Sequence, residues 1–495
     1  MPLTCPTPLT DQKLLRNAAY INGKWIDAHN GATFRVLNPA DDSEITSVAN
    51  MGQQETVEAI AAADLAWPSW RALSGKQRSA VLRRWFELIM ENQQDLARLI
   101  SLEQGKPLSE SLGEVAYGAS FVEWFAEEAK RIYGDTIPGH TPDKRIVVLK
   151  QPIGVVAAIT PWNFPLAMIT RKCAPALAVG CPVLIKPAPD TPLSALALAH
   201  LADKAGFPPG IFNVLPTSLT SEVGGELTSN PTVRKLSFTG STRVGQLLME
   251  QCAKTIKKLS LELGGNAPFI VFDDANLDEA VAGAMISKYR NTGQTCVCAN
   301  RLMVQAGVYD AFIEKLTKSV EALTVGPALS DDMTHEKSTQ GPLINDSAIA
   351  KVEEHIKDAV SKGARIVTGG QPHKLGGTFF QPTILANATS DMKVAREETF
   401  GPVAPVFRFE TEQEAIELAN DTPFGLAAYF YSENLRRVWR VAEALEAGLV
   451  GINDGLISTE VAPFGGIKMS GLGREGSKYG CDEFLEMKYL CFGGI

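Results

Sequence analysis

Three short segments of the sequence carry side chains that suit nucleophilic chemistry. Cys296 lies in NTGQTCVC, whose small residues allow the backbone to approach a substrate closely. Glu262 lies in LELGG, where apolar neighbours would raise the pKa of its carboxyl toward that of a general base. Asn163 lies in PWNFP and offers an amide donor, with Pro165 placed to begin a helix. Each has an ordinary alternative when taken alone: a packed thiol, a solvated carboxylate at a strand end, and a helix cap.

These segments fall within an alternation of short apolar strands and helices. Such an alternation predicts a parallel sheet that helices cover on both faces. Sheets of this kind bind nucleotides at the carboxyl ends of their strands. A second series, from residue 269 to about 452, predicts a second α/β domain. The first series comprises strands 183–185, 212–214 and 235–238 and helices 193–205, 219–229 and 242–257, and the second has helices 276–290, 309–323, 348–361 and 434–447.

The regions outside these two series are expected to form scaffold and assembly surfaces. Residues 56–66 and 76–103 have apolar residues at helical spacing. Residues 145–149 and 155–159 are predicted to be strands, because they contain β-branched residues. The tail, 478–495, is short, aromatic and apolar. Because an exposed strand edge invites pairing, we expect another subunit to cover it.

Composition excludes several classes of protein. The chain has 495 residues, of which 45% are hydrophobic and 21% charged, which indicates an ordered protein with more than one core. A net charge of -9 without a long cationic run argues against nucleic acid as a partner. The sequence shows neither a signal peptide nor a membrane span, so we expect a cytoplasmic location and no membrane partner. The eight scattered cysteines are expected to be reduced.

Several short motifs match the sequence but lack the surrounding residues that their function requires. GLGREG (471–476) has the spacing of a dinucleotide-binding turn, but loop-like sequence precedes it and the chain ends before an acidic ribose ligand. A glycine spacing typical of ATPases lacks the Lys-Ser/Thr that would follow it. His335 begins an HExxH-like segment without the second His, and Cys296 and Cys298 have no further pair of ligands at zinc-finger spacing. We therefore predict no metal.

The order of the motifs resembles the aldehyde dehydrogenase superfamily over almost the whole chain, from INGKW at 21–25 to the tail. The resemblance implies an α/β fold with a Rossmann-like cofactor domain, an α/β catalytic domain and a small oligomerisation β-extension. It also implies assembly as a homotetramer or homodimer. The further matches are KP at 186–187, SFTGS at 237–241, EETFGP at 397–402 and PFGG at 463–466. The implied boundaries are 1–136 and 156–267 for the NAD(P)-binding domain, 268–465 for the catalytic domain, and 137–155 and 478–495 for the oligomerisation segments.

The resemblance gives the three candidate residues their roles. It implies that the Cys296 thiolate adds to an aldehyde carbon, and that the Asn163 amide and the Cys296 N–H hold the resulting oxyanion. Hydride then leaves for the nicotinamide. Water activated by Glu262 hydrolyses the thioester, which argues against relatives that lack this base and pass the acyl group to coenzyme A.

A cofactor, NADP or NAD, is likewise implied by the resemblance. Lys186 would bond the adenosine ribose, and Glu398 the nicotinamide ribose. The start of a helix at Gly240 and Ser241 would offer N–H groups to the pyrophosphate. The remaining implied contacts are made by Trp162, Leu263 and Phe400.

Pro189 departs from the family pattern three residues after Lys186. Many NAD-preferring relatives have Glu there, and NADP-using semialdehyde relatives have a small hydroxyl residue. Proline neither bonds the 2′-hydroxyl nor repels a 2′-phosphate. We therefore expect use of both cofactors or a preference for NADP.

Within the family, the segments around Arg171, Arg290 and Ser458 are similar to the succinate semialdehyde dehydrogenase branch. Arg171 lies eight residues after Asn163, which on one helix would share its face. Two guanidinium groups and the Ser458 hydroxyl would then grip the carboxylate of a short semialdehyde. The alternatives are that each Arg makes a structural ion pair, and that the substrate is glutarate semialdehyde or another aldehyde. A non-catalytic protein on the same fold is an alternative of a different class.

Cys298 lies two residues from the nucleophile. Its ordinary role is that of a small packed side chain. Oxidation of Cys296 would nevertheless allow condensation with Cys298 into a strained and readily reduced bridge.

Overall fold

Two β-sheets form the centres of two α/β units in the computed structural model, which describes residues 9–329 and 337–494. The first sheet has eight strands, and its central strands β9, β8, β7, β10 and β11 are parallel. In spatial order its strands are β2 (Lys24–Ile26), β1 (Ala19–Ile21), β9 (Phe212–Val214), β8 (Val183–Lys186), β7 (Val155–Ile159), β10 (Val233–Thr239), β11 (Lys258–Glu262) and β21 (Gly471–Leu472).

Helices cover both faces of this sheet, as the apolar strands require. In β7, Val156 and Ala158 pack into one cluster of buried residues, whereas Val155, Ala157 and Ile159 pack into another. This alternation follows from the two-residue period of a strand. The first face carries α2 (Gly75–Glu91), α3 (Gln93–Gln104), α4 (Leu108–Glu128), α5 (Ala167–Val179) and α6 (Leu193–Ala205), and the second carries α1 (Gln53–Arg71), α7 (Thr220–Ser229) and α8 (Thr242–Ala253).

The second unit has a seven-stranded sheet that is parallel except for its edge strand β14. Helices α9 and α10 pack on one face of this sheet, and α11, α13 and α14 pack on the other. The strands in spatial order are β14 (Arg365–Thr368), β15 (Thr383–Ala388), β16 (Val403–Phe409), β13 (Ala299–Gln305), β12 (Ala267–Val271), β18 (Ala427–Tyr431) and β19 (Leu449–Ile452). Its helices are α9 (Leu277–Tyr289), α10 (Tyr309–Glu321), α11 (Asp346–Ser361), α12 (Lys393–Arg396), α13 (Glu412–Asn420) and α14 (Leu435–Ala444).

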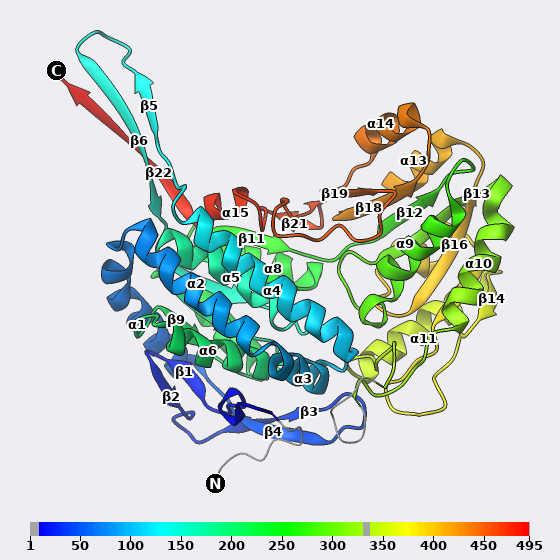
Figure 1. The fold of residues 1–495 in the computed structure, drawn as a ribbon, viewed down its shortest axis with the longest axis horizontal. Coiled ribbons are helices and arrows are strands. Elements are labelled where there is room, and N and C mark those ends of the chain that lie inside the picture. Colours follow the sequence, from blue (N-terminus) through cyan, green and yellow to red (C-terminus); the bar gives the residue numbers. More distant parts are fainter. Residues whose placement is uncertain (1–8, 330–336, 495) are drawn as a thin grey trace.

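A third, antiparallel sheet projects from the body as an arm (Figure 1). It contains β5 (Asp135–Pro138), β6 (Lys144–Pro152) and β22 (Leu485–Gly493), and β22 pairs with β6 along its whole length. The tail thus returns to a segment more than 300 residues earlier in the chain. Smaller elements are the hairpin β3 (Thr33–Leu37) with β4 (Glu44–Ala49), the pair β17 (Phe424–Gly425) with β20 (Ile467–Lys468), and α15 (Tyr479–Asp482).

The expected parallel sheet with helices on both faces is confirmed, but three local expectations are wrong. The helical pattern at 76–103 is two helices, because Asn92 leaves helical geometry and its amide donates to Leu88 O at 2.8 Å. The helix expected at 242–257 ends at Ala253. Pro165 does not begin a helix, since α5 starts at Ala167.

None of the helices that the structure describes combines the length and apolarity needed to cross a membrane. Within the same described residues, no group of three or more metal-binding side chains occurs. His335 and its HExxH-like segment begin outside the described residues.

Candidate active site

A cavity of about 720 Å³ lies between the two α/β units, at the carboxyl ends of strands β10 and β11. Both units contribute to its walls. Eight residues that the sequence analysis singled out line it together, although they are scattered over more than 230 positions: Trp162, Asn163, Gly240, Ser241, Leu263, Cys296, Glu398 and Phe400.

Cys296 is held by an irregular loop after α9. Asn291, Thr292 and Gly293 all have positive φ angles, of 51°, 55° and 76°. A side chain at Gly293 would meet Gly401 O at 2.2 Å, so this close approach requires glycine. The Cys296 thiol is half-buried, and burial raises its pKa to about 12, against the opposing effect of the Arg171 charge. The site therefore needs a base or nearby positive charge to form the thiolate.

Asn163 sits before α5 rather than on it. Its Nδ2 donates to Gln294 O at 3.0 Å, which ties it to the loop that carries the cysteine. An amide nitrogen has two hydrogens, so one remains for an oxyanion in the cavity. Asn163 and Arg171 do not share one helical face as expected, because Asn163 lies four residues before the helix begins.

Glu262 is the last residue of β11 and has a buried carboxylate. Neither carboxylate oxygen has a hydrogen-bond partner. Its pKa is raised well above the usual value, mainly by burial and further by the negative charge of Glu475, whereas Arg171 and Lys172 lower it. An unpaired carboxylate with a raised pKa is suited to accept a proton from water.

Arg171 is buried and ion-paired with Glu475, and Lys172 Nζ donates to the same carboxylate at 2.5 Å. The Arg171 guanidinium also lies 4.1 Å from the centre of the Phe464 ring. Its Nη2 makes no hydrogen bond of ordinary geometry, although the Tyr117 side chain interacts with the same guanidinium. The structural ion pair weighed as an alternative is therefore present, and a donor remains beside it.

The other two predicted substrate residues are more accessible. Arg290 is half-buried, with its guanidinium 5.2 Å from the Phe164 ring. Its charge, like that of Arg171, acts on Cys296 and lowers the pKa of the thiol. Ser458 is half-buried in the loop after β19.

The rest of the cavity has the groups that a nicotinamide dinucleotide requires. Trp162 and Phe400 form an aromatic wall with their rings 5.5 Å apart and nearly perpendicular. Glu398 accepts from Gly265 N at 3.1 Å through Oε1, and burial raises its pKa to about 7. Ser241 caps the amino terminus of α8, which presents N–H groups and a positive dipole end to the cavity. Apolar walls with a carboxylate and a helix terminus fit the implied cofactor.

The two residues expected at the adenosine end, Lys186 and Pro189, do not line this cavity. Pro189 lines an adjacent cavity of about 310 Å³, and both cavities are bordered by Ile344 and Asn345. Lys186 is buried at the end of β8, where its Nζ donates to Pro187 O at 3.2 Å and burial lowers its pKa to about 8.

The Cys298 thiol makes two hydrogen bonds in this structure. It is buried, its sulfur accepts from Thr295 Oγ1 at 2.8 Å, and its thiol donates to Lys288 O at 3.5 Å. These contacts favour the packing role.

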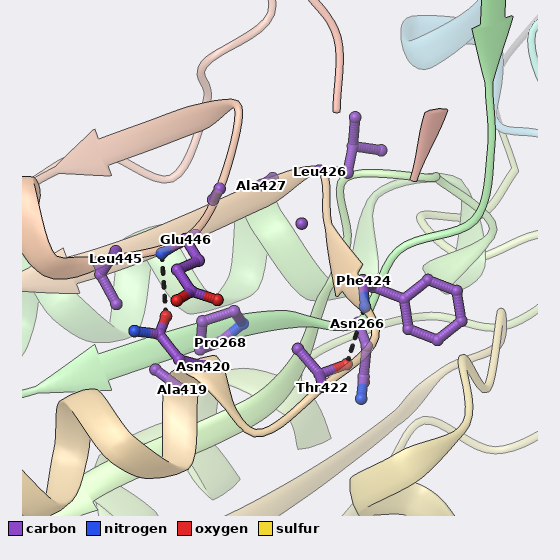
Figure 2. A pocket seen from close by; sticks show the side chains of 13 residues that line it. Asn266, Pro268, Ala419, Asn420, Thr422, Phe424, Leu426, Ala427, Leu445 and Glu446 are labelled. Carbon is purple, nitrogen blue, oxygen red and sulfur yellow. Dashed lines mark hydrogen bonds between the residues drawn. The ribbon is translucent and has the colours of Figure 1, made fainter. Parts of the chain in front are cut away.

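A smaller hollow lies in the second unit. Figure 2 shows Asn420 and Glu446 facing each other across it. Its volume is about 10 Å³, enough for a single water molecule, and Glu446 N already donates to Asn420 Oδ1 at 2.9 Å. We therefore place the site at the larger cavity.

Three buried charges near the site were missed by the sequence analysis. Glu475 lies in GLGREG, a segment considered only as a failed nucleotide motif. Lys106 and Glu114 lie before and in α4, in a region treated as scaffold. Nothing in the sequence pattern alone marks these residues, because the groups that they bind at the site lie 52 or more positions away.

The family model described as the aldehyde dehydrogenase family matches residues 25–490, and the chain belongs to that family. It is therefore an oxidoreductase, and the predicted family, fold class and enzyme class are confirmed. Glutarate-semialdehyde dehydrogenase of Pseudomonas aeruginosa is 66% identical over 98% of this chain and 100% of its own. The NADP(+) succinate-semialdehyde dehydrogenase of Escherichia coli is 64% identical over 98% and 99% of the two chains. The crystal structure of succinate-semialdehyde dehydrogenase from Burkholderia pseudomallei has a TM-score of 0.96 at 60% identity, covering 98% and 99%.

Proposed function

We propose that this enzyme oxidises succinate semialdehyde to succinate with NADP or NAD, with glutarate semialdehyde as the alternative substrate. The observation that carries the proposal is the buried Arg171 guanidinium, whose Nη2 makes no hydrogen bond of ordinary geometry and whose charge acts on Cys296. A buried guanidinium with such a donor favours a substrate that brings its own carboxylate. Relatives named for both semialdehydes match nearly the whole chain.

Residues of this chain would act one after another in the proposed reaction. The Cys296 sulfur forms a bond to the aldehyde carbon, and the Asn163 amide and Cys296 N–H donate to the oxygen that becomes negative. When bound, NAD(P)+ supplies the acceptor for the hydride that leaves this carbon. Glu262 then takes a proton from water, whose oxygen bonds to the acyl carbon of the thioester as the carbon–sulfur bond breaks. The products are the free acid and the regenerated cysteine.

Kinetics on three aldehydes test the substrate. We expect kcat/KM to be highest for succinate semialdehyde, lower for glutarate semialdehyde and lowest for butanal, which has the same carbon count but no carboxylate. A higher value for the five-carbon semialdehyde would transfer the proposal to that substrate. Equal values for butanal would contradict carboxylate recognition.

The non-catalytic alternative is tested by Cys296→Ala. The variant is expected to fold and to bind cofactor but to show no turnover, because the loop loses its nucleophile.

For Glu262→Gln we expect one rapid turnover followed by a slow steady rate, since the acyl group forms but is released slowly. An unchanged steady rate would assign water activation to another group.

For the cofactor, we propose use of both NADP and NAD with NADP preferred. Pro189 removes the carboxylate that would oppose a 2′-phosphate, and the Escherichia coli relative is named for NADP(+). The cofactor would lie along Trp162 and Phe400, with Glu398 at the nicotinamide ribose and Lys186 at the adenosine ribose.

We also propose the domain division 1–136 and 156–267, 268–465, and 137–155 with 478–495. The three largest sheets, of eight, seven and three strands, support this division. The arm exposes large apolar side chains, and such a surface favours assembly into a homodimer or homotetramer. Light scattering on the purified enzyme distinguishes these states from a monomer. The most exposed examples are Met487 at 76%, Tyr489 at 58% and Phe492 at 48%.

A further inference from the structure

The proposed reaction leaves a fully buried ion pair unused. The side chains of Lys106 and Glu114 are both 0% exposed, and Lys106 Nζ donates to Glu114 Oε2 at 2.6 Å. Lys106 follows Gly105, which ends α3 in the left-handed conformation, and Glu114 lies two turns later in α4. A buried pair of this kind adds little net stability over an apolar pair, so its contacts call for another explanation.

Lys106 reaches the backbone of Asn163. Its Nζ donates to Asn163 O at 2.7 Å and lies 3.8 Å from the centre of the Phe164 ring. Asn291 Nδ2 donates to the same oxygen at 3.1 Å. Asn163 O is therefore the point where the α3–α4 junction and the loop of Cys296 are joined.

Glu114 acts on the next residues of the same segment. Its Oε1 accepts from Leu166 N at 2.9 Å and from Ala167 N at 3.2 Å. These N–H groups open α5, the helix that carries Arg171. One carboxylate thus caps the helix and orients the lysine that holds Asn163.

We propose that Lys106 and Glu114 are positioning residues that fix the Asn163 amide relative to the Cys296 sulfur. The proposal rests on the proposed function, in which that amide donates to the oxyanion. An oxyanion donor acts over a narrow range of distances, and its loss typically lowers the rate by about 100- to 1,000-fold. Partial displacement of Asn163 should therefore slow acylation without removing the nucleophile.

The test uses the double variant Lys106→Met/Glu114→Gln. It avoids leaving one buried charge unpaired, and the amide introduced by Glu114→Gln keeps an oxygen for the α5 N–H groups. Single-turnover cofactor reduction is measured with succinate semialdehyde and with butanal, beside the rate of Cys296 alkylation by iodoacetamide and the thermal midpoint. Lys130→Met is the matched control, because Lys130 pairs with Glu127 in solvent at 2.7 Å.

We expect single-turnover reduction to fall at least 10-fold on both aldehydes, with alkylation, the thermal midpoint and KM close to those of the parent. Lys106→Arg, which keeps a donor, should recover part of the rate. A single-turnover rate of the double variant within twofold of the parent rate would overturn the proposal. The proposal would also fail if the alkylation rate and the thermal midpoint fell together with the single-turnover rate. If Cys296→Ala retained turnover, the proposed function itself would fail, whatever the outcome at Lys106.

Discussion

Arg171 and Glu475 form an ion pair shielded from solvent, yet the pair does not use all of the guanidinium. Glu475 also accepts from Lys172, so one carboxylate faces two cations. The Nη2 of Arg171 makes no hydrogen bond of ordinary geometry. A buried guanidinium whose charge acts on the cysteine favours a substrate that places an anionic group there.

Arg171→Ala and Arg290→Ala should each lower kcat/KM for succinate semialdehyde much more than for butanal. Loss of a hydrogen bond to a charged group costs about 1.5–3 kcal/mol, or roughly 10- to 100-fold. Steady-state kinetics on the two aldehydes measure the difference. Equal losses on both would show that the arginines do not bind the substrate carboxylate.

The rate of deacylation should depend on pH through the ionisation of Glu262. Burial and the Glu475 charge raise the pKa of Glu262 well above 4.5. Water activation needs the ionised form, so the deacylation rate should increase as pH rises through this raised pKa and should fall below it. Single-turnover acid release across pH gives the profile. An acid limb centred near pH 4.5 would contradict the raised pKa, and Glu262→Gln should remove the limb.

Glu475→Gln should destabilise the fold strongly, because Arg171 and Lys172 would be left buried without their carboxylate. Breaking one side of a buried pair typically costs about 3–5 kcal/mol. The control is Glu446→Gln, because the Glu446 side chain is 53% exposed beside Lys468. This substitution should lower the free energy of unfolding by only about 0–1 kcal/mol. Urea unfolding of both variants makes the comparison. Equal effects would mean that the cations find other partners.

The sequence predicted the parts of the fold that local periodicity controls. The buried strand β7 and helix α6 were located to within a residue, because apolar runs and helical spacing are local signals. The break at Asn92 was missed, since the flanking residues keep the same amphipathic pattern on both sides. A side-chain hydrogen bond, rather than the pattern, ends α2 there.

The residues of the candidate site were likewise predicted only where a local segment of the sequence marks them. Cys296, Glu262 and Asn163 were found because each lies in a segment of unusual composition and the segments occur in a family-like order. Glu475 was not found, because its significance comes from Lys172, 303 positions earlier in the chain. Pairings at that separation are set by the tertiary fold.

Pro189→Ser should raise kcat/KM for NADP relative to NAD. The substitution adds a hydroxyl donor beside the end of β8, and a hydrogen bond to a charged phosphate contributes about 1.5–3 kcal/mol when well formed, or about 10-fold or more. Fluorescence titration with both reduced cofactors measures binding apart from turnover. If kcat/KM for NADP relative to NAD did not change, position 189 would not face the 2′-phosphate.

The last prediction concerns Cys298, whose thiol is buried and hydrogen-bonded between Thr295 and Lys288. For a bridge to Cys296, this thiol must leave both contacts, and the short ring would be strained and easily reduced. If a bridge forms, mild peroxide oxidises Cys296 to a sulfenic acid, and the Cys298 sulfur displaces water from it. Peptide mass mapping should then find the two cysteines joined, and thiol reductant should restore activity. Cys298→Ser should lose that recovery while keeping normal turnover before oxidation. A variant that is inactivated and restored like the parent would limit Cys298 to packing beneath the loop.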